Sequence, residues 1–231
     1  MTGPDIERDT WKQMVGSAAA RRVEDGMIIG LGTGSTTNHF IHALARRVQE
    51  GLRIRGAVAS SEASKALASS LGILVSDLDT FPEIDLYIDG ADEIGPQLSL
   101  IKGGGGALLH EKIVASSAHH FIVIADKTKL VPRLGISFPV PIETVPFGAA
   151  PVHRRLQALG ATVQVRQIAG KVFLTEERNF ILDCTFPAGI ADPADLDAHF
   201  HAIAGVVESG IFLNLAHEAI IAGPDGFKTL P

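Results

Sequence analysis

Two carboxylates, Asp89 and Asp92, follow an apolar stretch of the chain. That stretch, residues 84–88, predicts a buried strand, and a Gly-Ala pair separates the two acids. Carboxylates that converge at a strand end could hold sugar hydroxyls, bind a metal ion such as Mg²⁺, or act as acid and base. A polar turn with a helix cap is the alternative without chemistry, and the spacing alone does not choose among these.

A lysine before a glycine cluster is the second candidate for chemistry. Lys102 directly precedes Gly103–Gly106, and such glycines let the backbone approach a ligand closely and let a loop move. Lys102 could therefore hold an oxyanion. Glu111 lies nine residues later, in the first turns of a predicted helix over 107–117, where it could act as a general base. Taken alone, a glutamate there is more often a solvated helix residue.

A third candidate is the turn from Gly30 to Thr37, which joins a predicted strand to a predicted helix. Its backbone N–H groups, the helix dipole and its hydroxyl side chains make an anion site. It lacks the lysine of a Walker loop and the third glycine of a dinucleotide fingerprint. The turn therefore favours a compact phosphate over a pyrophosphate.

A lysine beyond a further predicted strand could complete that phosphate site. Residues 121–125 predict the strand, and Asp126 follows it directly. Lys127 and Lys129 both lie just after this strand end, and spacing does not choose between them.

The elements that must position these residues alternate between strand and helix. Such alternation predicts an α/β fold, a Rossmann-like parallel sheet with helices on both faces. Sites in such sheets lie at the carboxyl ends of the strands, where the candidates fall. The predicted strands are 27–29, 54–59, 73–75, 84–88 and 121–125, and the predicted helices are 6–23, 40–51, 61–70 and 107–117.

The pattern changes after Gly135, which predicts a second domain. Residues 136–208 follow the order strand-helix-strand-strand-helix-strand with one extra short segment at 171–174, as in an inserted ferredoxin-like α+β domain. The Rossmann-like catalytic domain then comprises residues 1–135 and 209–231. Asp192 is the expected N-cap of the helix that begins at Pro193.

Composition excludes several classes of function. The chain has 231 residues, 24 of them glycine, and a formal net charge of −6, without a basic run that would favour nucleic acid. Its apolar stretches are too short to span a bilayer, and its N-terminus does not resemble a secretory signal. The single Cys184, expected to be a small buried side chain, favours a reducing compartment. We therefore expect a cytoplasmic protein that binds neither nucleic acid nor membranes.

The candidates together resemble ribose-5-phosphate isomerase of the A type, in order and spacing and over nearly the whole chain. The motifs that carry the resemblance are Gly32–Thr36, Asp89–Glu93, Lys102–Gly105, Glu111–Lys112, Asp126–Lys129, Ile181–Asp183 and Pro224–Thr229. The resemblance implies interconversion of ribose 5-phosphate and ribulose 5-phosphate in the pentose phosphate pathway, without a metal or another cofactor.

The resemblance also implies roles for individual residues. Glu111 is the implied proton acceptor, and we assign Lys102 to the enediolate oxygen. Asp89 and Asp92 are expected to hold substrate hydroxyls, and one of these two acids, which the sequence does not single out, to assist ring opening. The implied substrate-binding residues are Thr33, Gly34, Ser35, Thr36, Asp89, Gly90, Ala91, Asp92, Lys102, Gly103, Gly104, Gly105, Lys129 and, from the first helix, Lys12.

The expected partner is a small phosphosugar, and family members are commonly homodimers or tetramers. The chief alternative is a non-catalytic sugar-phosphate sensor on the same fold, as in some transcriptional regulators. Such a sensor should carry a DNA-binding helix-turn-helix, and only residues 1–26 precede the first predicted strand. A nicotinamide-dependent dehydrogenase is a weaker alternative.

Overall fold

The computed structural model describes residues 3–231; Met1 and Thr2, which begin the stretch considered for a secretory signal, lie outside it. The chain forms two compact units. Unit 1 comprises Met1–Ala91, His110–Lys129 and Asn214–Pro231, and unit 2 comprises Asp92–Leu109 and Leu130–Leu213. The segment Asp92–Leu109 thus packs as part of unit 2. The domain boundaries that the sequence suggests, at residues 136 and 208, stay a prediction.

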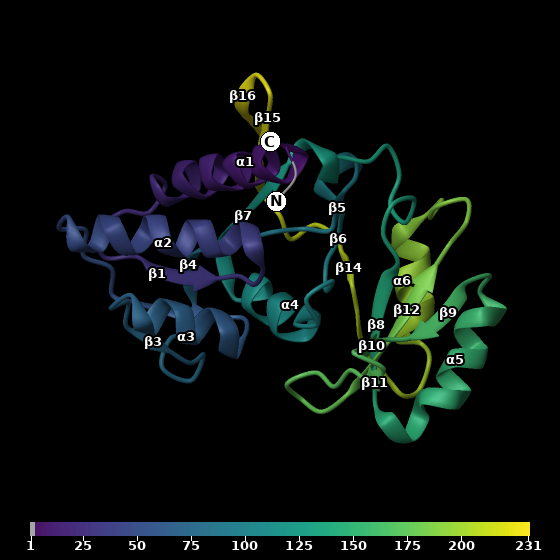
Figure 1. Cartoon of the computed structure of the whole chain (residues 1–231). Coiled ribbons are helices and arrows are strands. Elements are labelled where there is room, and N and C mark those ends of the chain that lie inside the picture. The colour runs from purple at the N-terminus through teal and green to yellow at the C-terminus, as the bar shows by residue number, and fades with distance from the viewer. Residues whose placement is uncertain (1–2) are drawn as a thin grey trace. The chain divides into compact units, whose positions relative to one another are not determined.

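Unit 1 is built on a seven-stranded sheet in the order β16-β15-β7-β4-β1-β2-β3. Every neighbouring pair is parallel except β15 with β16, the C-terminal hairpin, which is yellow in Figure 1 and lies beside β7. The strands are β1 (Ile28–Leu31), β2 (Gly56–Ala59), β3 (Val75–Ser76), β4 (Ile84–Asp89), β7 (Ala118–Asp126), β15 (Glu218–Gly223) and β16 (Gly226–Leu230).

The register of these strands gathers their carboxyl ends at one edge. Leu31 of β1 pairs with Ala59 of β2 and with Ile88 of β4, and Asp89 pairs with Val123 of β7. Residues that follow β1, β2 and β4 therefore lie close together, as the parallel-sheet prediction requires.

Helices cover both faces of this sheet, as predicted. The connections β1-α2-β2 and β2-α3-β3 run one way across the sheet and β4-α4-β7 runs the other way. Right-handed crossovers in opposite directions place their helices on opposite faces. The helices are α1 (Gly3–Ala20), α2 (Ser35–Gln49), α3 (Glu62–Ser70) and α4 (Leu108–Ser116).

The core of unit 1 comes from the apolar stripes that the sequence shows. Phe40, Ile41 and Leu44 of α2 are fully buried, at the helical spacing that predicted this helix. They pack with Val15 of α1 and with Ile29 of β1 in one cluster. Helix α1 lies beside α2 in Figure 1, so the two apolar stripes close over the sheet together.

Unit 2 contains the ferredoxin-like order. Its four-stranded antiparallel sheet has the order β13-β8-β12-β9, and two helices connect its strands. The extra short segment predicted near 171 pairs in a hairpin, β10 (Gln167–Ile168) with β11 (Lys171–Val172). The remaining elements are β8 (Val140–Thr144), α5 (Ala149–Ala158), β9 (Thr162–Val165), β12 (Phe180–Thr185), α6 (Pro193–His201) and β13 (Val206–Ser209).

Local signals inside unit 2 behave as the sequence predicts. The Asp192 side chain caps α6 by accepting hydrogen bonds from the N–H groups of Ala194 and Asp195, each at 3.1 Å. Cys184 is a free, fully buried thiol in the core. Burial raises the pKa of that thiol to about 12, so it stays protonated and unreactive in the folded chain.

A small three-stranded sheet in unit 2 was not predicted. It has the order β14-β6-β5 and consists of β5 (Glu93–Ile94), β6 (Leu100–Ile101) and β14 (Ile211–Phe212). Two-residue strands carry no periodic pattern, and β14 lies more than 100 positions after β6, so only the tertiary structure reveals this sheet. Within the part of the chain that the structure describes, no helix is long and apolar enough to cross a membrane.

Candidate functional site

Asp89 is the centre of a buried hydrogen-bond network in unit 1. It ends β4 and is 0% exposed. Its Oδ1 accepts hydrogen bonds from the N–H of Thr33 at 2.9 Å, from the N–H of Gly90 at 2.7 Å and from the Thr37 hydroxyl at 3.2 Å. A buried charge needs such donors to offset desolvation, and here they also fix the orientation of the carboxylate.

Tyr87 completes this network, and the sequence analysis did not identify it. Its hydroxyl donates to Asp89 Oδ2 at 2.5 Å, and its ring lies 4.7 Å from the ring of Phe121. Burial, followed by the charges of Asp89 and Glu111, raises the pKa of Tyr87 well above 10.0. Tyr87 stands two positions before Asp89 on the same strand, so strand periodicity could have placed both on one face.

Glycine is required beside Asp89 because the turn passes close to the carboxylate. A Cβ on Gly32 would lie 2.0 Å from Asp89 Oδ1. Gly34 is the N-cap of α2 with a φ of 115°, a left-handed conformation that other residues adopt only under strain. The glycines of this turn therefore make room for Asp89 and begin the helix.

Hydroxyl groups tie the same turn to the loop after β2. Thr33 Oγ1 lies 2.9 Å from Ser60 Oγ and donates to Ser61 Oγ at 2.8 Å. Ser64 Oγ donates to the carbonyl oxygen of Gly32 at 2.6 Å. The Thr33 hydroxyl is thus part of the frame that shapes the turn.

Ser35 and Thr36 differ from Thr33 in their surroundings. Ser35 is exposed and Thr36 is half-buried at the start of α2, and no side chain caps this helix. The ammonium of Lys12, from α1, donates to Ser35 Oγ at 2.9 Å. The structure therefore brings Lys12 to the hydroxyl-rich turn, 23 residues away in sequence.

The two lysines after β7 are distinguished by the structure. Lys127 is exposed, and its Nζ lies 5.4 Å from the centroid of the Trp11 ring. Lys129 is half-buried in the short helix η2 (Lys127–Lys129). Asp126, 3% exposed, holds this turn by accepting the N–H of Thr128 at 2.9 Å.

Glu111 lies in the first turn of α4 and is only 3% exposed. This burial contradicts the ordinary alternative of a solvated helix carboxylate. Its charge contributes to the raised pKa of Tyr87, which places Glu111 within electrostatic range of the Asp89 network. Two buried carboxylates, Asp89 and Glu111, therefore act on one buried tyrosine.

In unit 2, Lys102 follows β6 and is 2% exposed. Its N–H donates to the carbonyl oxygen of Gly210 at 2.9 Å, and its Nζ lies 5.6 Å from the centroid of the Phe212 ring. A lysine is rarely buried so deeply unless its charge is used or paired.

The glycine loop after Lys102 is shaped by Asp92. The N–H of Gly104 donates to Asp92 Oδ2 at 2.7 Å, and a Cβ on Gly104 would lie 2.6 Å from Asp92 Oδ1. The N–H of Gly106 closes a turn on the carbonyl oxygen of Gly103 at 3.0 Å. Asp92 thus positions a backbone peptide, while Gly104 and Gly105 remain exposed.

Glu93 has a structural role that the sequence did not assign. It is 0% exposed and accepts backbone hydrogen bonds from the N–H groups of Gly135 at 2.6 Å, Ser137 at 2.5 Å and Phe138 at 2.8 Å. It therefore anchors the segment that leads into β8. Asp89–Glu93 contains carboxylates with three different surroundings.

Arg166 contacts both Asp183 and the glycine loop, and the sequence analysis did not identify this arrangement. Asp183, which the sequence analysis had only as part of a family motif, forms an ion pair with Arg166. Arg166 also donates to the carbonyl oxygens of Gly103 and Gly104. Nothing in the sequence links residue 166 to residue 103; the pairing of β9 with β12 brings Arg166 beside Asp183, and only the packed chain brings its guanidinium to the glycine loop.

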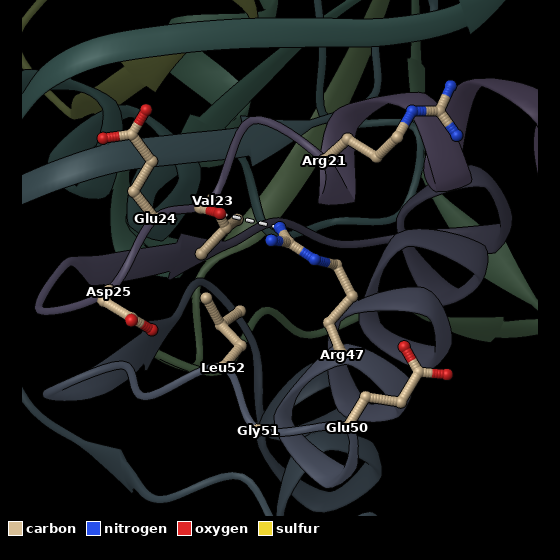
Figure 2. Close-up of a pocket in the computed structure, with 8 residues that line it drawn as sticks. All are labelled: Arg21, Val23, Glu24, Asp25, Arg47, Glu50, Gly51 and Leu52. Carbon is tan, nitrogen blue, oxygen red and sulfur yellow. Dashed lines mark hydrogen bonds between the residues drawn. The ribbon is translucent and has the colours of Figure 1, made fainter.

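A cavity of about 500 Å³ in unit 1 is lined by none of the candidate site residues. Figure 2 shows Arg47 pointing toward Val23, and its guanidinium donates to the Val23 carbonyl oxygen at 2.7 Å. The lining segments 21–25 and 50–52 precede β1 and β2, so the cavity is at the amino ends of the strands. Sites in parallel sheets form at the opposite edge, and Arg47 here caps the end of α1.

The comparisons with known proteins agree with this arrangement. A family model for ribose 5-phosphate isomerase A (phosphoriboisomerase A) matches residues 56–226, which include Asp89, Lys102, Glu111 and Lys129. Ribose-5-phosphate isomerase A of Roseiflexus sp. (strain RS-1) is 50% identical over 228 residues, which cover 97% of both chains.

Solved structures are similar as well. A D-ribose-5-phosphate isomerase in complex with phospho-erythronic acid has a TM-score of 0.93 at 38% identity, covering 96% of this chain and 98% of its own. Ribose 5-phosphate isomerase from Plasmodium falciparum has a TM-score of 0.93 at 36% identity with the same coverage. These relatives support the isomerase over the sensor alternative. The chain belongs to the ribose 5-phosphate isomerase A family.

Proposed function

We propose that this chain is a ribose-5-phosphate isomerase that interconverts ribose 5-phosphate and ribulose 5-phosphate through an enediolate, with Glu111 as the general base. Family membership supports the reaction, and the burial of Glu111 beside the Asp89 network carries the assignment of the base. Burial keeps bulk water from the base and places it in a low-dielectric region, where electrostatic effects are large.

Glu111 moves the proton between the two reacting carbons. It removes the proton from C2 of the open-chain aldose, and the electron pair of that C–H bond leaves negative charge on O1. The same proton returns to C1, while the hydroxyl proton of O2 is transferred to O1, so the ketose forms without gain or loss of atoms. A positioned base of this kind contributes about 10²–10⁴-fold to the rate.

Lys102 and amides of the Gly103–Gly105 loop, other than the Gly104 N–H that donates to Asp92, stabilise the negative charge that develops on O1 of the enediolate. Lys102 is a buried cation, and such groups act strongly because they need no reorganisation at the moment of reaction. Each donor to a developing oxyanion contributes about 3–4 kcal/mol.

The phosphate and the hydroxyl groups anchor the substrate away from the reacting carbons. Ser35, Thr36, Lys12 and Lys129 bind the phosphate, with Lys129 preferred to Lys127 because Lys127 lies over Trp11. Gly34 and Thr33 contribute the backbone of the same turn, in which the Thr33 N–H donates to Asp89 Oδ1. Binding energy from this remote group holds the sugar in the reactive position.

The acids of the Asp89–Asp92 segment bind substrate hydroxyls, and Asp89 assists ring opening. Gly90 and Ala91, between them, contribute backbone contacts to the same substrate. The fixed orientation of Asp89 by backbone and hydroxyl donors supports this role, because a preorganised carboxylate loses little entropy on binding.

The decisive test is an isomerase assay with ribose 5-phosphate, with and without a chelator. We expect wild-type activity in both conditions, because no step is assigned to a metal. Glu111→Gln should lower kcat by about 10²–10⁴-fold. Glu62→Gln, which changes an exposed carboxylate in the first turn of α3, should leave kcat unchanged. Near-normal turnover by folded Glu111→Gln would refute the base, and loss of activity with chelator would refute the metal-free reaction.

We further propose that the protein is a cytoplasmic homo-oligomer, a dimer or a tetramer. The 102% exposed Phe147 and the 38% exposed Val145 support a subunit contact near η3 (Pro146–Gly148). Sedimentation should give a mass at least twice 24.4 kDa, and a monomer across micromolar concentrations would refute the assembly.

A further inference from the structure

The guanidinium of Arg166 joins a side chain and a loop of unit 2. Its Nε donates to Asp183 Oδ2 at 2.9 Å and its Nη2 donates to Asp183 Oδ1, a bidentate ion pair. Its Nη1 donates to the carbonyl oxygen of Gly103 at 2.7 Å and to that of Gly104 at 3.2 Å. One side chain thus connects β12 with the glycine loop.

These contacts determine which way the loop peptides face. In a trans peptide, the carbonyl and the N–H of the next residue point in opposite directions. The peptide between Gly103 and Gly104 is held at both ends, since Arg166 binds its oxygen and Asp92 accepts its N–H at 2.7 Å. The N–H of Gly104 is therefore committed to Asp92.

The next peptide is held through its oxygen. Arg166 binds the carbonyl of Gly104, so the N–H of Gly105 points away from the guanidinium. Glycines have no side chains to restrain their own backbone, and an unrestrained run of them loses much entropy when it is ordered. A restraint on these carbonyls must therefore come from elsewhere in the fold.

We infer that Arg166, held by Asp183, is a positioning residue that orients the Gly104–Gly105 peptide so that the Gly105 N–H donates to the enediolate oxygen. This inference rests on the proposed isomerase function, and it assigns the oxyanion-donor role to the Gly105 amide in place of the Gly104 amide, whose N–H donates to Asp92. An arginine is required because its planar fork reaches the carboxylate and both carbonyls together, whereas a lysine ammonium is a point charge.

The test compares steady-state kinetics and thermal unfolding of the full-length protein. Arg166→Lys and Arg166→Met should lower kcat by on the order of 100-fold, as small misplacement of a catalytic group does. KM for ribose 5-phosphate should change less than about threefold, because a donor to the transition state is lost while ground-state binding remains. Arg166→Lys keeps the positive charge, so it still tests the inference if Arg166→Met does not fold.

Glu143→Gln is the matched control. Glu143 is 1% exposed in β8 and accepts hydrogen bonds from Thr175 at 2.8 Å and from Asn179 at 3.0 Å. It therefore lies in the sheet that contains Asp183, but these two hydrogen bonds do not involve the glycine loop. Glu143→Gln should lower the unfolding temperature and leave kcat within about twofold of wild type, because it keeps the side-chain shape and weakens only the charge-assisted hydrogen bonds to Thr175 and Asn179. If it lowers kcat as much as Arg166→Lys does, the positioning role is overturned.

Asp183→Asn tests whether Asp183 acts through Arg166. The double variant Arg166→Lys/Asp183→Asn should lose no more kcat than the larger single loss, since coupled residues are non-additive. Losses that multiply would overturn the inference, and so would Arg166 variants with kcat within about twofold of wild type. Absence of isomerase activity in the wild-type protein would instead refute the proposed function.

Discussion

Asp89 in unit 1 and the Gly103–Gly105 loop in unit 2 are held in opposite ways. Asp89 is a fully buried side chain whose oxygens accept hydrogen bonds from surrounding backbone and hydroxyl groups. The loop is backbone, exposed at Gly104, and a side chain from beyond β9 holds its carbonyls. In one region the backbone positions a side chain, and in the other a side chain positions the backbone.

The difference has a physical cause. A sheet edge offers rigid N–H groups, so a carboxylate at the end of β4 acquires its orientation from neighbours already in place. A glycine loop offers free backbone groups for a ligand but no rigidity, so it needs an external clamp. Substitutions in the first region should therefore change stability and activity together, and those in the second should change activity more than stability.

The largest expected effect comes from replacing one glycine in each region by alanine. Gly32→Ala would place a Cβ 2.0 Å from Asp89 Oδ1 in the buried network. We expect the unfolding free energy to fall by about 3 kcal/mol and kcat/KM to fall by on the order of 100-fold. Gly104→Ala meets Asp92 at 2.6 Å in an exposed loop. It should lower kcat while changing the unfolding free energy by less than about 1 kcal/mol, because the loop can shift.

Urea unfolding and steady-state kinetics of the two alanine variants check this contrast. Equal losses of stability in Gly32→Ala and Gly104→Ala would show that the two regions are equally rigid. Gly72→Ala, at an exposed turn of unit 1 with open space around the Cβ, gives for comparison the cost of alanine at a positive φ, a strain that Gly32 and Gly104 do not have.

An intermediate effect is expected from Tyr87→Phe. The ring and its packing on Phe121 are kept, and only the donor to Asp89 Oδ2 is lost. A hydrogen bond to a charged group contributes about 1.5–3 kcal/mol, so stability should fall by that amount. We expect kcat to fall about tenfold as Asp89 gains freedom. Unchanged stability and unchanged kcat would show that the remaining donors suffice to orient Asp89.

The smallest effect concerns high pH, and it also reports on the Asp89 network. Tyr87 is the only tyrosine in the chain, and its pKa in the folded state is raised above 10.0. Above pH 10.0 the unfolded chain loses this proton while the folded chain keeps it. The stability due to Tyr87 is therefore fully present below that pH and declines as pH rises further.

Tyrosinate absorbance provides the measurement. In the folded protein the signal should stay absent near pH 10.0 and appear only with unfolding, whereas the denatured chain should titrate near its ordinary value. Tyr87→Phe should remove this component of the alkaline loss of stability. An ordinary midpoint in the folded wild type would contradict the buried hydrogen bond to Asp89.

Much of the fold could be predicted because local patterns carried it. The apolar stripe at Phe40, Ile41 and Leu44 predicted α2, and Asp192 before Pro193 predicted the start of α6. The three-stranded sheet around β5 could not be predicted, since two-residue strands carry no periodic pattern and β14 is distant in the chain. The candidate site could likewise be predicted only in part. The sequence analysis identified its motif residues, but not Tyr87 or Arg166.

The sequence by itself determined which residues are the candidates for chemistry. Gly32, Asp89, Lys102 and Glu111 are recognisable because glycine turns and strand ends place such residues in regular local contexts. Only the tertiary structure decided how they are held. The donors to Asp89 come from several chain segments, and Arg166 reaches Gly103 across 63 positions of sequence. Burial and hydrogen-bond direction are properties of the packed chain, and no spacing along the sequence specifies them.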